Sequence, residues 1–153
     1  MNTEVTKKDT ITLSLVDIAI IEFKLSSRAY ELEFQLPYEN YEFQFHIQLN
    51  FDESQQLALL PLRVTLYEKD NKIELAQLKI RATFKILNFE EVIKKVDGQF
   101  KFPTALISIT AGVTVSTARG IFFMNVRDTI LKNALMPIVD PSIFSSVEKT
   151  LNQ

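Results

Sequence analysis

The sequence contains no cysteine and no tryptophan, and it has a single histidine among its 153 residues. Without cysteine there are no thiolate nucleophiles, no disulfides and no Cys/His zinc sites. We therefore expect a cytoplasmic protein that holds no metal.

Glycine is scarce as well, because the chain has only Gly98, Gly112 and Gly120, whereas average usage is about 7%. At these spacings the glycines form neither a G-x-G-x-x-G nor a G-x-x-x-x-G-K-[ST] phosphate loop. Nucleotide chemistry is therefore unsupported, and we expect no cofactor.

An excess of positive charge is also missing. Lys and Arg number 17 against 19 Asp and Glu, which gives a net charge of −2. A protein that neutralises phosphates needs a basic surplus, so nucleic acid is not an expected partner.

No apolar stretch approaches the ~18 residues that a membrane span requires, and we expect no membrane insertion. Lys7 and Lys8 precede an apolar run from Ile11 to Ile21, as in a signal peptide, but Asp17 interrupts the run and an alternating pattern follows it. We interpret this run as a first β-strand.

The chain is instead rich in apolar side chains, which make up 46% of it and include 12 Phe and 4 Tyr. Its length is typical of one domain with one core. We therefore predict a single domain over residues 1–153.

Strand patterns fill the first half of the chain. Apolar residues alternate with polar ones from Tyr41 to Phe51, and residues 62–66 and 73–75 flank a polar turn as in a hairpin. The apolar phase then shifts from odd to even numbers, which predicts a β-bulge near Ala76 and Gln77. Residues 28–36 fit either a strand or an extended excursion.

Helix patterns dominate the second half. Acidic residues open and basic residues close a short predicted helix over 89–97, which Gly98 ends. The segment 103–119 is rich in strand formers, yet its length between Pro103 and Gly120 favours a helix. Two more helices are expected, near 126–135 and from Asp140 onward. Strands followed by helices predict an α+β fold, with an antiparallel sheet covered by helices on one face.

Catalytic constellations are not found. His46 lies on the polar side of the predicted strand 41–51 beside glutamines, where a surface role is the simpler interpretation. No carboxylates pair as acid and base, and no serine sits in a G-x-S-x-G elbow. We therefore expect no enzyme. The many aromatic residues indicate exposed apolar surface that binds a partner polypeptide.

Three stretches resemble the SecB family of export chaperones. Phe102-Pro103 opens the long predicted helix, Ala118-Arg119-Gly120-Ile121-Phe122 closes it, and the run from Leu135 to Phe144 leads into the last helix. Upstream, the segment Leu62-Arg63-Val64-Thr65-Leu66 resembles the family's third strand. The pattern covers roughly residues 17–147.

This resemblance implies a four-stranded antiparallel sheet with helices on one face, assembled as a dimer of dimers through the long helices. It also implies a holdase without enzymatic activity that binds unfolded or preprotein polypeptide and docks on a translocase motor. Because a net charge of −2 is weak for such docking, a chaperone that guards the antitoxin of a toxin-antitoxin system is an alternative. A hotdog-like domain that binds a small ligand is another.

Two sets of candidate residues follow. Strand aromatics and residues near the expected grooves are candidates for client binding: Tyr41, Phe43, Phe45, Phe84, Phe122, Phe123 and Ile143. Small or apolar residues of the uncharged helix are candidates for the interface of a homo-oligomer, because they allow close approach of a second helix: Ala105, Ser108, Ile109, Ala111, Gly112, Val113 and Ser116.

Overall fold

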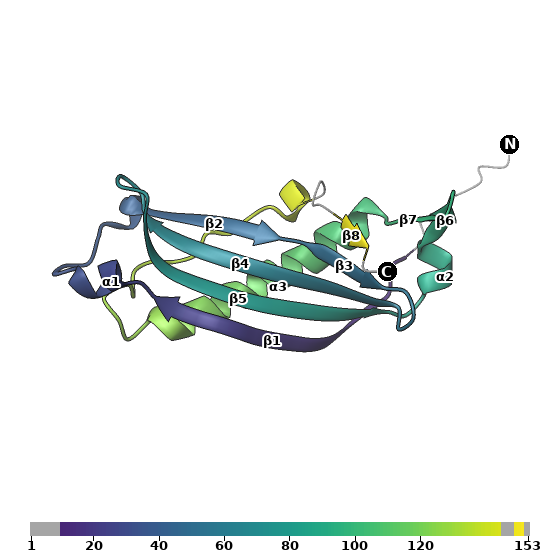
Figure 1. The fold of residues 1–153 in the computed structure, drawn as a ribbon, viewed down its shortest axis with the longest axis horizontal. Helices are drawn as coiled ribbons and strands as arrows, with labels where there is room; N and C mark the ends of the chain where they lie inside the picture. Colours follow the sequence, from purple (N-terminus) through teal and green to yellow (C-terminus); the bar gives the residue numbers. More distant parts are fainter. Residues whose placement is uncertain (1–9, 145–148, 152–153) are drawn as a thin grey trace, which may run out of the picture.

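The computed structural model describes residues 10–144 and 149–151, in which a strand-rich first half precedes one long helix (Figure 1). The elements are β1 (Leu13–Leu25), α1 (Ser27–Glu31), the 3₁₀ turn η1 (Tyr38–Asn40), β2 (Tyr41–Ile47), β3 (Leu49–Asp52), β4 (Leu57–Glu68), β5 (Ile73–Ile86), α2 (Phe89–Val92), β6 (Lys94–Val96), β7 (Gln99–Lys101), α3 (Thr104–Val126), the 3₁₀ turn η2 (Pro141–Phe144) and β8 (Lys149–Leu151).

The large sheet has the order β1-β5-β4-β3-β8, and β2 also pairs with β4. Every pair in it is antiparallel except the short β3–β8 pair, which is parallel. Helix α3 crosses behind the sheet in Figure 1 and covers one face. The predicted α+β fold, an antiparallel sheet with helical cover on one face, is confirmed. The number of strands is corrected, since the described residues form a sheet of six strands instead of the four that the resemblance implies.

β2 and β3 form one line along β4 that is interrupted only at Gln48. The register is continuous, since Ile47 lies opposite Leu62 and Asn50 opposite Leu59. Gln48 donates its backbone N–H to the carbonyl of Pro61 at 3.1 Å. Proline has no N–H to return the bond, so the ladder lacks one hydrogen bond there.

The core lies between the sheet and α3. Even-numbered residues of β4 and β5 are buried on this face, for example Leu62, Leu66, Leu78 and Ile80. Burying each such side chain contributes about 1.5–3 kcal/mol to stability. The predicted bulge is present at Leu75, just before Ala76: Leu66 pairs with Ala76 and the next residue of β4 already pairs with Glu74.

The helix predicted over 89–97 is wrong beyond its first turn. Only Phe89–Val92 is helical, and β6 and β7 then form a hairpin around Asp97 and Gly98. Both turn residues have positive φ, 53° and 78°, which suits the tight turn that Asp-Gly favours. That turn signal and the β-branched Val96 outweigh the charge pattern of a helix.

The helix predicted over 103–119 is confirmed and continues to Val126. The further helix at 126–135 is wrong, because residues 127–133 form turns. The Thr129 hydroxyl donates to the carbonyl of Val126 and accepts from the N–H of Leu131, and such local bonds compete with helix formation.

The last predicted helix is also wrong where the structure describes it. Residues 141–144 form a single 3₁₀ turn and Lys149–Leu151 form a strand. The part that includes Val147 lies outside the described residues.

By length and composition alone, α3 is long and apolar enough to cross a membrane. The expectation that no apolar stretch reaches this length is therefore wrong. However, 44% of its apolar 18-residue stretch is buried inside the structure. Core helices of globular domains have the same property.

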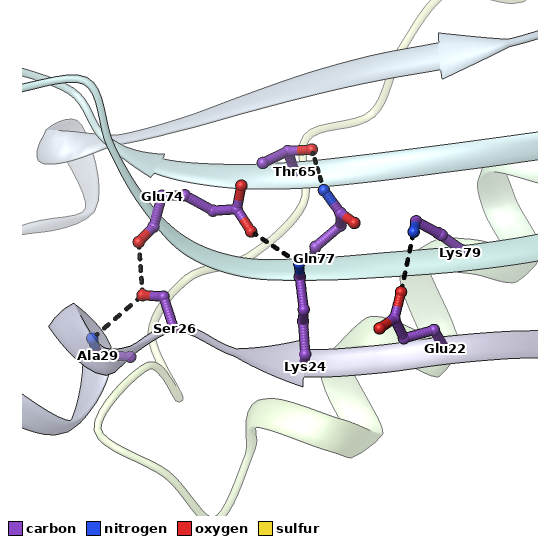
Figure 2. Close-up of polar contacts among 8 residues, drawn as sticks. All are labelled: Glu22, Lys24, Ser26, Ala29, Thr65, Glu74, Gln77 and Lys79. Carbon is purple, nitrogen blue, oxygen red and sulfur yellow. Dashed lines mark hydrogen bonds and ion pairs between the residues drawn. The ribbon is translucent and has the colours of Figure 1, made fainter.

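Residues 28–36 are not a strand, because they begin with the short helix α1 (Figure 2). The Ser26 side chain caps α1 by accepting from the N–H of Ala29, and its hydroxyl donates to the carbonyl of Glu74. Arg28 pairs with Glu68, the buried last residue of β4, at 3.0 Å, and this contact raises the pKa of Arg28. These contacts fix where the chain leaves β1.

Candidate functional site

The seven candidates for polypeptide binding are not all at the surface. Phe84 and Phe122 are core residues with 2% and 0% exposure, so their assignment to a binding surface is corrected. Phe84 of β5 and Phe122 of α3 belong to the hydrophobic core between the sheet and the helix. Phe123 and Ile143 are exposed, and Tyr41, Phe43 and Phe45 are half-buried on β2.

Two of the candidates, Tyr41 and Phe43, line an apolar groove of about 340 Å³. We call it the β2 groove. It lies between the start of β2 and residues 133–137, which we call the return segment. Its lining consists of Tyr38, Glu39, Tyr41, Phe43, Asn133, Leu135 and Pro137.

Asn133 fastens the return segment to β2. Its side-chain oxygen accepts a hydrogen bond from the Tyr41 hydroxyl at 2.9 Å, and its amide donates to the carbonyl of Leu36 at 2.7 Å. Burial raises the pKa of Tyr41, so its hydroxyl stays protonated as a donor at neutral pH. Farther along, Arg119 of α3 donates to the carbonyl of Pro137 at 3.1 Å.

Phe122 of α3 packs against Phe43, one of the residues that line the groove. Its ring meets Phe43 edge to face with centroids 5.3 Å apart, and it meets Phe23 of β1 in the same way at 6.0 Å. Such edge-to-face pairs are favourable and directional. Phe43 therefore presents one side to the core and the other to the groove.

Five lining residues were not found from the sequence: the polar Glu39 and Asn133, and the apolar or aromatic Tyr38, Leu135 and Pro137. Tyr38 and Leu135 are 73% and 65% exposed. Each lies one or two residues from a proline that breaks the regular pattern. The periodicity of the sequence therefore does not assign them to a face of a strand or helix. Bulky apolar residues outside any periodic segment were the available signal.

The edge of β2 that faces away from β4 pairs with no strand among the described residues, since β8 reaches only β3. An unpaired edge carries backbone N–H and C=O groups that can bind an added strand. The β2 groove thus combines apolar side chains with free backbone hydrogen-bonding groups.

The candidates for a helix interface divide between the two sides of α3. Ser108, Ile109, Gly112, Val113 and Ser116 line a shallow outward depression together with Thr117 and Pro141. Ala105 is exposed nearby, whereas Ala111 is 1% exposed beneath the sheet and is corrected to a core residue.

Gly112 has a partner within its own chain. A Cβ added there would lie 2.9 Å from Cγ of Pro141. The missing side chain therefore lets η2 dock on α3. The interface prediction itself stays a prediction for the remaining outward residues.

A further exposed apolar surface was missed, on edge strand β1. Leu15, Val16, Ile20 and Ile21 are exposed there. Register shifts between Leu15 and Asp17 and between Ile20 and Glu22 leave Val16 and Ile21 as bulged residues. Bulges in an edge strand change where side chains point and limit uncontrolled pairing.

No group of three His, Cys, Asp or Glu side chains that could hold a metal occurs within residues 10–144 and 149–151. His46 lies exposed beside Gln48, with 3.4 Å between the imidazole Nε2 and the amide nitrogen.

Comparison with known proteins places this fold. The chain is similar to the SecB-like chaperone Rv1957 of Mycobacterium tuberculosis, solved in complex with a ChAD peptide from the Rv1956 HigA1 antitoxin. The TM-score is 0.60 at 10% identity, over 83% of this chain and 89% of that one. A protein of unknown function from Streptococcus agalactiae has a TM-score of 0.39 at 12% identity, over 77% and 90% of the two chains.

The sequence matches no protein-family model and no curated protein. The likeness to Rv1957 is therefore one of structure and not of sequence, and it covers most of both chains. The chain has the fold of a SecB-like chaperone.

Proposed function

We propose that this protein is a chaperone that binds extended, apolar polypeptide segments in the β2 groove, without enzymatic activity. One observation carries the proposal: an apolar groove is lined by residues of β2, whose outer edge pairs with no other strand in the part of the chain that the structure describes. An extended peptide can hydrogen-bond to such an edge and place alternate side chains in the groove.

The groove suits clients of varied sequence. Backbone hydrogen bonds to β2 do not depend on the client's side chains, and Tyr38, Phe43 and Leu135 offer apolar area without a shaped pocket. Tyr41 and Asn133 satisfy one another, so an apolar client leaves neither of them unpaired.

The structural likeness to Rv1957 supports a polypeptide client, since that SecB-like chaperone holds a peptide from an antitoxin. It favours a chaperone over the hotdog-like small-ligand alternative. Preproteins for export and an antitoxin are the two client classes we propose.

The test is suppression of aggregation of a chemically unfolded client at equimolar chaperone. Wild type should suppress light scattering. Leu135→Glu should lose most of the effect, because a charge in the groove opposes apolar contact. Leu87→Glu is the matched control, since Leu87 is also exposed but lies in the turn after β5.

Equal suppression by Leu135→Glu and wild type would place the clients elsewhere. No suppression by wild type, with several unrelated clients, would refute the chaperone proposal. Circular dichroism of both variants is the control for whether they remain folded.

A further inference from the structure

The face of the large sheet opposite α3, here called the open face, carries a concentration of cations at its centre. Arg63 of β4 and Lys79 and Arg81 of β5 surround a hollow of about 330 Å³. The other residues that line this hollow are Ile21, His46, Gln48, Pro61, Leu62 and Ile80. None of these residues lines the β2 groove.

The central cations are only partly neutralised. Glu22 of β1 pairs with Lys79 at 2.9 Å (Figure 2), and this contact lowers the pKa of Glu22. Arg63 and Arg81 form no ion pair with any residue that the structure describes. The centre therefore carries a positive excess in a chain whose net charge is −2.

Arg63 and Lys79 also lie directly opposite each other in the β4–β5 register. Like charges at facing positions of two strands repel and destabilise a sheet. Two neighbouring cations are paired: Lys24 of β1 lies 3.8 Å from Glu74, and Lys72 in the turn before β5 pairs with Glu42. Lys85 of β5 has no ion pair among the described residues but donates to the carbonyl of Gln55. Glu22 offsets Lys79, but no described residue offsets Arg63. Such a local conflict is expected at functional or strained sites.

The spacing of these cations matches an extended chain. Lys79 and Arg81 are two residues apart on one strand, so their Cα atoms are separated by about 6.6 Å, the same repeat as alternate side chains of an extended peptide. Arg63 extends the set onto β4, the neighbouring strand.

We propose that the centre of the open face binds an extended acidic polypeptide segment with Glu or Asp at alternate positions. Its carboxylates would pair with Arg81 and Lys79 along β5 and with Arg63 across to β4. Guanidinium groups bind carboxylates in bidentate fashion, which gives such a site orientation as well as charge attraction. The two termini outside the described residues do not fit: residues 1–9 carry two acidic residues and two lysines, and residues 152–153 carry no charged side chain.

Nucleic acid is disfavoured as the occupant. The site has three cations and no Phe, Tyr or Trp among its lining residues, whereas single strands are bound by stacking on several such aromatics along a longer basic groove. The chain as a whole also carries no basic excess.

The test is fluorescence anisotropy with the full chain and a short labelled peptide in which Glu alternates with Ser, compared with the peptide that has Gln in place of Glu. We expect the Glu peptide to bind and the Gln peptide not to bind. Binding should weaken as salt is raised from about 50 mM to about 200 mM, because exposed charges are screened. The double variant Arg63→Gln with Arg81→Gln should bind the Glu peptide at least about tenfold more weakly.

The matched control removes two other cations. Lys94 and Lys101 are exposed and lie opposite each other in the β6–β7 hairpin. Lys94→Gln with Lys101→Gln should change the affinity by less than about twofold. The Arg63 and Arg81 variant should melt no lower than wild type, because it removes repulsion on an exposed surface.

Three results would overturn the proposal: no binding of the Glu peptide at low salt, equal weakening by the two double variants, or tighter binding of a short oligouridylate than of the Glu peptide. The groove variant Leu135→Glu should bind the Glu peptide as wild type does. The open-face site is thereby tested separately from the chaperone function.

Discussion

Phe122 and Phe123 are adjacent in α3 but have opposite surroundings. Phe122 is fully buried between the rings of Phe23 and Phe43, whereas Phe123 is 43% exposed. Truncating a buried Phe removes apolar contacts and leaves a cavity, which costs about 3–5 kcal/mol. We therefore expect Phe122→Ala to destabilise by that amount and Phe123→Ala by less than about 0.5 kcal/mol.

Urea unfolding followed by circular dichroism measures both variants. Similar losses for the two would contradict the burial assigned here. Retained client binding by Phe123→Ala would show that this exposed ring lies outside the binding surface.

At the scale of single residues the sequence predicts the alternation of β2 but not the depth of each aromatic. Tyr41 and Phe43 were identified because period two marks them as one face of a strand. Phe84 lies on a similar alternating strand, yet it is buried because β4 and β1 flank β5 and α3 covers it. Which strands are central is not encoded in any one strand's pattern.

Two glycines lie in different backbone conformations, one in the β6–β7 turn and one within α3. Gly98 has φ +78° in the β6–β7 turn, while Gly120 lies within α3, and an added Cβ would meet nothing within 4 Å at either position. Gly98→Ala should therefore destabilise by about 1–2 kcal/mol through backbone strain alone. Gly120→Ala should stabilise by about 0.5–1 kcal/mol, since alanine loses less entropy in a helix.

Thermal melts of the two single variants test this pair. A gain in stability from Gly98→Ala, or a large loss from Gly120→Ala, would contradict the conformations described for the two elements. The double variant should show additive effects, because the sites are in separate elements.

Most long elements could be predicted from the sequence, and the errors fall at short ones. Asp97-Gly98 was interpreted as a helix stop, although the same dipeptide is a strong hairpin signal. The residues after Val126 have helical composition, but the hydroxyl of Thr129 forms local bonds that end α3. Charge patterns and helix propensities are weak predictors of secondary structure for segments of only about four to nine residues.

For the whole molecule we predict a homo-oligomer in which the outward side of α3 is an interface. Ile109 and Val113 are exposed around the depression beside Pro141, so a second copy would remove apolar surface from water. Val113→Glu should reduce the mass of the particle while keeping its circular dichroism. Met124→Glu is the control, because Met124 is exposed on the same helix outside the depression.

Light scattering at micromolar concentration gives the mass directly. A wild type that behaves as a folded monomer of 17.6 kDa would refute the oligomer. Ala111→Glu is unsuitable as a probe, since a charge at that buried position would unfold the chain.

The candidate site could be predicted only in part, because it forms between distant parts of the chain. The bond from Tyr41 to Asn133 spans 92 positions, and that from Asn133 to Leu36 spans 97. Local patterns contain no information on which loop returns to which strand. The open-face cations were visible as the polar positions of two strands, but their facing arrangement required the register of β4 and β5.

Pro61 has a consequence for how the sheet opens. Hydrogen-bonded segments tend to open as cooperative blocks whose limits lie where bonding is interrupted. The missing bond at Gln48 divides the line along β4 into a block of seven residues, β2, and a block of four, β3. Local opening of β2 can therefore stop at Pro61 while β3 stays paired with both β4 and β8. The strand that borders the groove can therefore separate from β4 as a block of its own, leaving the β3–β4 pairing in place.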